Sequence, residues 1–243
     1  MPLTVCHPAA AWPVRRFLPR LPLDAVVLGT MAPDFEYVLR LAVGGGSWHR
    51  PRDFILLAVP MALVACALFR FVVRPAFVAL LPRGLVADPG ERGWTLTAAA
   101  AIAGALTHVI WDGFTHRTGW FVALVPVLRE RVPGLPIPWF SVLQHGSTLV
   151  GGLLIAAWVA AEVRARRAAA RTFAPGQGRR AAAVVLALVA FATLASVANG
   201  ARVLGSRFEW VLGYAAVGGM AGLAAGAILF GVASRLSPER ARQ

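Results

Sequence analysis

Five histidines and a few carboxylates are the residues of this sequence whose types and spacing could carry chemistry. The block ALTHVIWDGFTHRTGW places His108, Asp112 and His116 four residues apart. If one helix carries all three, their side chains leave the same face and drift by about 40° per step. Imidazole and carboxylate at this spacing suit a divalent metal such as zinc. The alternative is a His108–Asp112 hydrogen bond that stabilises helix packing, and the block taken alone favours that alternative.

Asp34 is a second carboxylate that could take part. In GTMAPDFEYVLRL, Gly29 and Pro33 interrupt the apolar run just before it. Irregular backbone in an apolar environment is tolerated where it is buried in protein or lines a cavity. Asp34 is also a favourable N-cap for a helix over FEYVLRL, and the roles of cap and ligand are compatible. Glu36 is a first-turn charge of that helix and only a reserve ligand.

The other three histidines, His7, His49 and His145, are spread along the chain. Each taken alone is typical of a surface or interfacial histidine. By the topology derived below, these three and His116 lie in loops on the outer side of a membrane, and His108 lies toward the outer end of a span. That gathering predicts one site, and it turns the interpretation of the helical block toward a metal.

The composition indicates what kind of scaffold positions these residues. The 243 residues are 58% hydrophobic and 14% charged, and the mean hydropathy is +0.67. An average globular domain carries about 25% charged residues, so this chain has too few to cover a soluble surface. The net charge of +13 comes from arginine without any lysine, which is typical of a compositional bias rather than of nucleic-acid binding. Cys6 and Cys66 are too few for a disulfide framework. We therefore predict a membrane protein whose partners are membrane lipids and not nucleic acid.

The predicted fold is all-α, a polytopic membrane helical bundle with about five transmembrane helices plus N-terminal re-entrant or interfacial helices. Crossing a hydrocarbon core takes about 20 helical residues. Five apolar stretches approach that length: 54–73, 95–112, 146–163, 180–198 and 210–233. A sixth stretch, 21–43, carries Asp24, Asp34, Glu36 and Arg40. Charges at mid-bilayer depth are costly, so we expect 21–43 to be re-entrant or to lie on the surface.

We predict a single integral-membrane domain over 1–233, and the positive-inside rule orients it. The densest arginine cluster lies in 164–180, which the rule places in the cytoplasm. The parts would be a polar-site part (1–163), a basic cytoplasmic loop (164–180), two C-terminal packing helices (181–233) and a short cytoplasmic tail (234–243). The histidines would then face outward from a bacterial inner membrane.

The last predicted helix is rich in glycine. Gly218, Gly222 and Gly226 recur at four-residue spacing, which indicates close helix packing. The packing could lie within one chain or between chains of a homo-oligomer, and the spacing does not distinguish the two.

Four segments together resemble a known family: TVCHPAAAWPVRR, LDAVVLGTMAPDFEYVLRL, GALTHVIWDGFTHRTGWFV and LQHGSTLVG. They resemble a bacterial membrane-protein family named domain of unknown function 4184, over about residues 1–230. The order of the motifs is also similar, more distantly, to that of predicted membrane-bound metal-dependent hydrolases. That resemblance implies a set of metal ligands: His7, Asp34, His49, His108, Asp112 and His145, with His116 as an additional candidate. The segment S-W-H-R-P differs from the hydrolase pattern, which has a second histidine there.

Our first functional hypothesis is a metal-dependent, zinc-like hydrolase that acts at the membrane surface on a lipid-like or phospho-ester substrate. The cofactor would be zinc or another divalent metal, and Asp34 and Asp112 are the catalytic candidates. Arg50, Arg52 and Arg117 could hold a phosphate, although anchoring to lipid headgroups explains them equally well. The alternative is a non-enzymatic scaffold, transporter or complex subunit in which the His/Asp cluster is a structural hydrogen-bond network.

Overall fold

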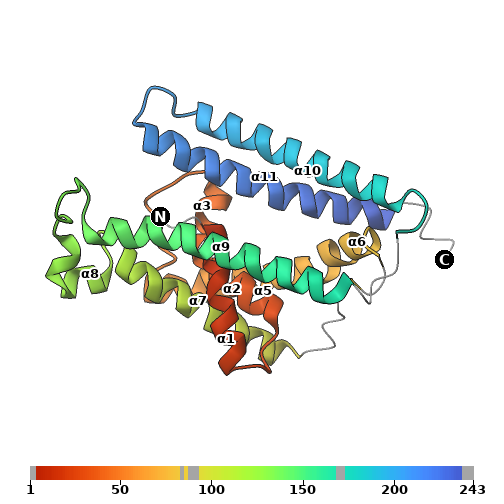
Figure 1. Cartoon of the computed structure of the whole chain (residues 1–243), viewed down its shortest axis with the longest axis horizontal. Helices are drawn as coiled ribbons and strands as arrows, with labels where there is room; N and C mark the ends of the chain where they lie inside the picture. Colours follow the sequence, from red (N-terminus) through yellow and green to blue (C-terminus); the bar gives the residue numbers. More distant parts are fainter. Residues whose placement is uncertain (1–3, 83–84, 87–92, 168–172, 237–243) are drawn as a thin grey trace. The chain divides into compact units, whose positions relative to one another are not determined.

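The structure is a computed structural model of the chain and describes residues 4–82, 85–86, 93–167 and 173–236. These residues form helices and no strand, which confirms the predicted all-α fold. Figure 1 shows the helices in the colours of the sequence. In chain order they are η1 (Thr4–Ala10), α1 (Ala11–Phe17), α2 (Leu23–Met31), η2 (Ala32–Asp34), α3 (Phe35–Arg40), α4 (Pro51–Asp53), η3 (Phe54–Ala58), α5 (Val59–Leu68), η4 (Phe69–Val73), α6 (Arg74–Ala79), α7 (Trp94–Thr115), α8 (Trp120–Leu124), η5 (Pro126–Arg129), α9 (Trp139–Arg167), α10 (Gln177–Ala201) and α11 (Phe208–Leu236).

Five helical stretches within the described residues are long and apolar enough to cross a membrane, as predicted. They are Pro51–Ala79, Trp94–Leu124, Trp139–Arg166, Gln177–Ala201 and Phe208–Leu236. Each contains one of the predicted apolar stretches and extends beyond it at both ends. The extensions include polar and aromatic residues, which add little to the hydropathy signal. The chain is thus a multi-pass membrane protein by the length and composition of its helices.

The segment predicted to be re-entrant or surface-lying forms a broken helical path from Leu23 to Arg40. The nine-residue helix α2 passes into the single 3-10 turn η2, which contains Pro33, and then into α3. A nine-residue α-helix is about 14 Å long, too short to cross a bilayer. The proline ring disfavours continuation of the α-helix, so the path changes geometry at the residue before Asp34.

Helix α2 packs closely against α7 along a stripe of small residues. A Cβ atom on Gly29 would overlap the backbone carbonyl of Ala101, and one on Gly104 would overlap that of Val26. The buried stripe of α7 recurs every three or four residues and comprises Thr97, Ala100, Ala101, Gly104, Ala105, His108, Asp112, Gly113 and Thr115. His108 and Asp112 therefore continue the same buried face on which the small residues bring the two backbones together.

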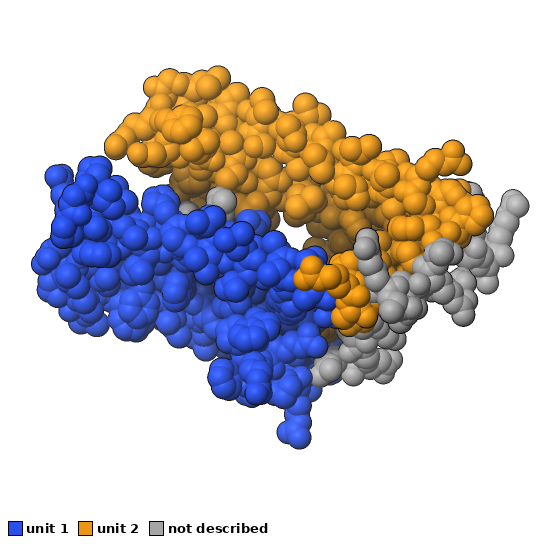
Figure 2. All heavy atoms as spheres, viewed as in Figure 1, with its two compact units in different colours: residues 1–34, 47–63, 89–162 blue, residues 35–46, 64–88, 163–243 orange. Residues whose placement is uncertain are grey.

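The chain divides into two compact units, which Figure 2 shows in different colours. Unit 1 comprises Met1–Asp34, Ser47–Leu63 and Pro89–Glu162. Unit 2 comprises Phe35–Gly46, Val64–Asp88 and Val163–Gln243. The histidines and both catalytic candidates belong to unit 1.

Unit 2 contains the pair of long helices α10 and α11, which lie side by side (Figure 1). Gly218 faces the backbone of Ala195, and Gly222 and Gly226 face neighbouring residues of α10. The glycine spacing therefore serves a helix contact within the chain, while a homo-oligomer stays a prediction. Helix occupies both ends of the predicted loop 164–180, because α9 runs to Arg167 and α10 begins at Gln177. Residues 168–172 of that loop, with Arg171, and 237–243 of the predicted tail lie outside the described residues.

Candidate metal centre

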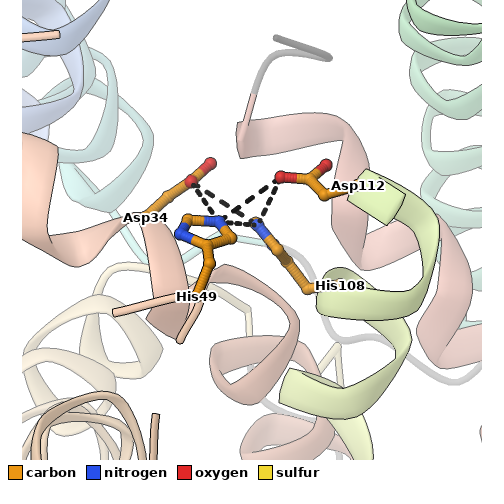
Figure 3. Close-up of side chains that lie close together, drawn as sticks. All are labelled: Asp34, His49, His108 and Asp112. Atoms are coloured by element: carbon orange, nitrogen blue, oxygen red, sulfur yellow. Dashed lines mark hydrogen bonds and ion pairs between the residues drawn. The ribbon is translucent and has the colours of Figure 1, made fainter. Parts of the chain in front are cut away.

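Four of the predicted ligands come together in unit 1 from three separate segments. Asp34 ends η2, His49 stands in the loop before α4, and His108 and Asp112 lie one turn apart on α7. Each offers one ligand atom, and the four atoms all lie within 4.8 Å of one another. Figure 3 shows the four side chains converging from opposite sides on a common point. The i,i+4 spacing noticed in the sequence supplies half of this group.

Five of the six separations among the four inward-facing ligand atoms are short and nearly uniform. His49 Nε2 and His108 Nε2 are 3.1 Å apart. Each lies 3.3 Å from Asp112 Oδ2 and 3.5 Å from Asp34 Oδ1. Two ligands bonded to one divalent cation at about 2.0–2.2 Å, with bond angles between about 90° and 109°, lie about 2.8–3.6 Å apart. All five separations fall in that range, so the group has the dimensions of a metal coordination shell.

The tautomer of His108 follows from its second ring nitrogen. His108 Nδ1 is 2.7 Å from the backbone carbonyl oxygen of Thr30. A carbonyl only accepts hydrogen bonds, so Nδ1 carries the hydrogen and, in the neutral ring, Nε2 presents a lone pair. That lone pair faces the two carboxylate oxygens, which are also acceptors. An added proton or a cation must lie among these atoms for the arrangement to be stable.

Several buried polar atoms around the centre have no hydrogen-bond partner within the described residues. They are His7 Nε2, Asp34 Oδ1 and Asp112 Oδ1. The side chains of Asp34 and His108 are fully buried. A buried carboxylate without compensation is strongly unfavourable, so these oxygens indicate that a positive group belongs in the site.

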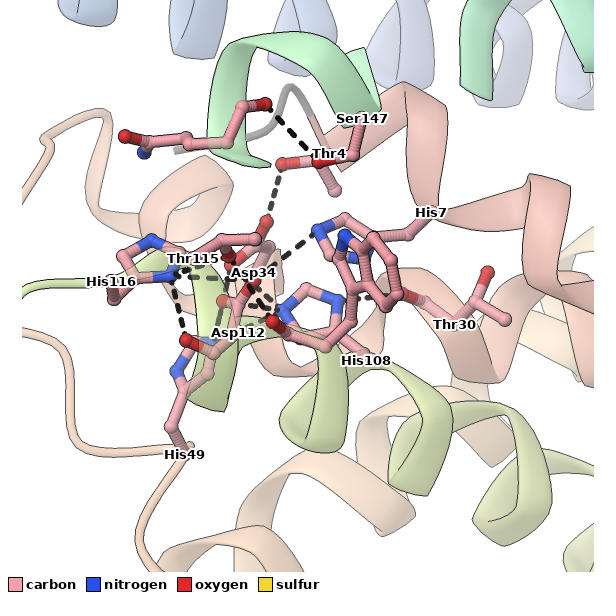
Figure 4. A network of polar contacts seen from close by, with 12 residues as sticks. Thr4, His7, Thr30, Asp34, His49, His108, Asp112, Thr115, His116 and Ser147 are labelled. Atoms are coloured by element: carbon pink, nitrogen blue, oxygen red, sulfur yellow. Dashed lines mark hydrogen bonds and ion pairs between the residues drawn. The ribbon is translucent and has the colours of Figure 1, made fainter. Parts of the chain in front are cut away.

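His7 and His116 lie beside the group of four, and both are close to the Asp112 carboxylate (Figure 4). Asp112 Oδ1 lies 3.7 Å from His7 Nε2 and 3.5 Å from His116 Nδ1. The ring of His7 stacks on that of His108, with centroids 3.8 Å apart and planes 20° from parallel. Helix α7 ends at Thr115 and His116 is its extended C-cap, so His116 does not continue the helical face of His108 and Asp112. His116 nonetheless remains beside Asp112.

Burial and mutual charge shift the pKa values of the site residues that lie outside the spans. Burial lowers the pKa of His7 to about 4, with a further lowering from His108. Burial alone would raise the pKa of Asp34, but His108 and His49 outweigh it and hold this pKa well below its usual range. Burial also opposes the charged form of His49, but the nearby carboxylates of Asp112 and Asp34 raise its pKa above the ordinary value. Asp34 is therefore ionised and His7 neutral at pH 7.

Other predicted site residues lie outside the group. His145 is exposed on α9, and among the described residues no hydrogen bond or ion pair joins it to the four ligands. The three arginines considered for phosphate binding are also exposed, and among the described residues no hydrogen bond or ion pair joins them to the four ligands. They are Arg50, Arg52 and Arg117. Glu36, the reserve ligand, forms an ion pair with Arg40 at 3.3 Å.

Two residues that the sequence did not single out support the ligands. The backbone of Thr30 orients His108, and Thr4 Oγ1 donates a hydrogen bond of 2.6 Å to Asp34 Oδ2. Asp34 thus uses Oδ2 for Thr4 rather than for a helix cap. Thr4 begins the segment TVCHPAAAWPVRR but is 30 residues from Asp34, so no local pattern could have revealed the contact.

Comparison with known proteins gives one match. The chain matches the family described as Domain of unknown function (DUF4184) over residues 1–232. No curated protein and no solved structure matches it. The matched region includes every residue of the candidate metal centre. The chain therefore belongs to the DUF4184 family, whose function is unknown.

Proposed function

We propose that unit 1 binds one divalent metal ion through Asp34, His49, His108 and Asp112, and that the protein uses this centre to hydrolyse an ester at a membrane surface. The observation that carries the proposal is the set of five ligand separations of 3.1–3.5 Å. The donor set of two imidazoles and two carboxylates suits zinc or another first-row divalent ion.

Charge supports a metal over a bare hydrogen-bond network. A single proton satisfies one donor–acceptor pair, whereas a divalent cation interacts with all four inward-facing atoms at once. Two carboxylates also match the charge of a divalent ion. The lone pair of His108 Nε2 is already directed at the centre by the Thr30 carbonyl, so the site is organised before any ion binds.

The residues of the centre would have different roles in hydrolysis. A bound divalent cation supplies Lewis acidity and lowers the pKa of water. The His49 side chain is 23% exposed, while those of Asp34 and His108 are fully buried, so water and substrate approach from the His49 side. Asp112 presents Oδ2 to the group and keeps Oδ1 without a hydrogen-bond donor among the described residues, so Oδ1 can accept a proton. A lipid-like or phospho-ester substrate suits a centre carried by a membrane protein.

A structural network is the second candidate. The 3.1 Å separation of His49 Nε2 and His108 Nε2 is also a hydrogen-bond distance. With a proton on His49 Nε2, the cluster would tie the loop before α4 to α7 and stabilise unit 1 without a metal. The protein would then be a scaffold, transporter or complex subunit.

Metal content separates the two candidates. The protein is purified in detergent from zinc-supplemented cells, and its metal content is measured by elemental analysis. We expect about one equivalent in the wild type and less than about a tenth in His108→Ala and Asp112→Asn. His145→Ala is the matched control, because it removes an exposed histidine outside the group, and it should retain the metal. A wild type without stoichiometric metal would favour the structural network.

Hydrolysis is tested on the same samples with a chromogenic phosphodiester, a chromogenic carboxylic ester and anionic phospholipid vesicles. We expect the wild type and His145→Ala to hydrolyse at least one of these probes, and Asp112→Asn to lose at least about 100-fold in rate. Metal binding without hydrolysis of any probe, or equal rates in Asp112→Asn, would contradict the hydrolase while leaving the metal centre in place.

Orientation has a separate test. We propose a bacterial inner-membrane location with a cytoplasmic C-terminus and the histidines on the outer side, following the positive-inside rule. An alkaline phosphatase fused after Gln243 should be inactive, and one fused into the loop after His116 should be active. The reverse pattern would place the metal centre at the cytoplasmic face.

A further inference from the structure

The N-terminal helix η1 reaches the candidate metal centre with two side chains, Thr4 and His7. Thr4 is 5% exposed and Asp34 is fully buried. Thr4 Oγ1 donates its hydrogen to Asp34 Oδ2 over 2.6 Å, because an ionised carboxylate can only accept. Figure 4 shows Thr4 above the cluster, on the side of Asp34 away from His49. The two oxygens of Asp34 thus have different surroundings.

Asp34 Oδ1 faces the centre, while Oδ2 is held by Thr4. Oδ1 lies 3.5 Å from both His49 Nε2 and His108 Nε2 and has no hydrogen-bond donor of its own in the described part of the chain. We propose that Thr4 is a positioning residue that fixes the Asp34 carboxylate, so that only Oδ1 is presented to the cation. This inference rests on the proposed metal centre. It adds that the hydrogen bond from Thr4 to Asp34 strengthens metal binding there.

The position of Thr4 is itself fixed by contacts of η1 with α9. Cys6 Sγ donates a hydrogen bond to the Thr148 carbonyl oxygen over 3.2 Å. A Cβ atom on Gly151 would come within 3.0 Å of the Cys6 carbonyl oxygen, so the glycine allows α9 to approach η1 closely. On the opposite side, His7 stacks on His108. The hydroxyl of Thr4 therefore reaches Asp34 from a segment held at several points.

Removal of the hydroxyl changes the carboxylate rather than the fold. In Thr4→Val, Asp34 Oδ2 loses its donor while the volume of the side chain is nearly unchanged. The carboxylate is then free to turn and to bind the cation through both oxygens. Loss of an outer hydrogen bond to a ligand typically weakens metal affinity about 10–100-fold.

The test measures zinc affinity of the full-length protein in detergent by competition with a chelating dye. We expect Thr4→Val to bind zinc about 10–100-fold more weakly than the wild type, and Thr4→Ser, which keeps the hydroxyl, to bind within about threefold of it. The matched control is Thr97→Val, which removes a fully buried hydroxyl eleven residues before His108 on α7. This control should leave the affinity unchanged.

A cobalt spectrum supplies a readout that a loss of stability would not move. With Co²⁺ in place of zinc, visible absorption reports coordination number, and we expect a weaker band in Thr4→Val because Asp34 adds a second oxygen. If Thr4→Val does not fold, Thr4→Ala removes the hydroxyl with less bulk and carries the same expectation. Affinity within about threefold of wild type in the variants without the hydroxyl would overturn the role of Thr4. A wild type that binds no zinc would overturn the metal centre itself.

Discussion

The helix pair α2–α7 of unit 1 and the pair α10–α11 of unit 2 use the same packing device. In unit 1, Gly29 and Gly104 let two backbones approach, and in unit 2 Gly218 and Gly222 do so. On α7, however, the buried face continues past Gly104 into His108 and Asp112. On α11, the buried residues are Val217, Gly218, Gly222 and Gly231, which carry no polar side chain.

The two units also differ in how their buried polar groups are satisfied. In unit 2, Asn199 donates to the Tyr214 carbonyl oxygen at 2.6 Å and accepts from Arg202 at 2.8 Å. In unit 1, buried atoms of His7, Asp34 and Asp112 have no hydrogen-bond donor or acceptor among the described residues. Buried polar groups in a packed helix pair are normally paired. The buried polar group of unit 2 is thus satisfied within the chain, whereas unit 1 holds buried groups that a metal ion could satisfy.

The largest expected effect is that of a chelator on unit 1. A ligand present at 100 times its Kd stabilises the folded state by about 2.7 kcal/mol. Removal of the metal should therefore lower the melting temperature of the wild type by about 5–10 °C. Melting curves of the detergent-solubilised protein with and without EDTA measure this shift. Asp112→Asn should melt at the same temperature in both conditions, and an equal shift in this variant would show that EDTA acts elsewhere.

The next effect compares the two glycine contacts. Gly104→Ala and Gly222→Ala each place a Cβ against backbone or Cβ atoms of the facing helix, so each should destabilise the protein by about 1–3 kcal/mol. Gly104→Ala should also weaken zinc binding at least about tenfold, because it displaces Thr30 from His108. Gly222→Ala should bind zinc as the wild type does. Equal zinc affinities in the two variants would contradict the claim that the α2–α7 contact positions the centre.

The smallest effect is expected at the buried amide of unit 2. Asn199→Ala removes hydrogen bonds of the kind that contribute about 0.6–1.7 kcal/mol between membrane helices. The free energy of unfolding, derived from thermal melting, should decrease by this amount. The metal content should be unchanged. Loss of the metal in Asn199→Ala would indicate that the two units are coupled, contrary to the comparison above.

Much of the fold could be predicted from the sequence because its determinants are local. Long apolar runs specify the membrane helices, and the structure confirms all five. Helix ends were harder to predict, since polar residues at the interface continue a helix without a hydropathy signal. Pro33 marked the break before Asp34, and the structure has a 3-10 turn there.

The candidate site was predictable only in part, because only some of its determinants are local in the sequence. The spacing of His108 and Asp112 on one helix is a local property. Asp34 was suggested by the proline break beside it and His49 by the predicted topology, and the resemblance to a family implied both as ligands. The same reasoning included His145, which the structure leaves exposed, because neither topology nor an order of motifs specifies which residues meet. The contact of Thr4 with Asp34 depends on how η1 packs against α2. The hydrophobic pattern of the sequence does not predict such a long-range contact.

Anomalous diffraction at the zinc edge, from crystals of the purified wild-type protein, tests the central claim most directly. The account predicts a single strong peak among the four ligands, about 2.0–2.2 Å from Asp34 Oδ1, His49 Nε2, His108 Nε2 and Asp112 Oδ2. A zinc-supplemented crystal with no peak there, and with the four side chains hydrogen-bonded to one another, would contradict it.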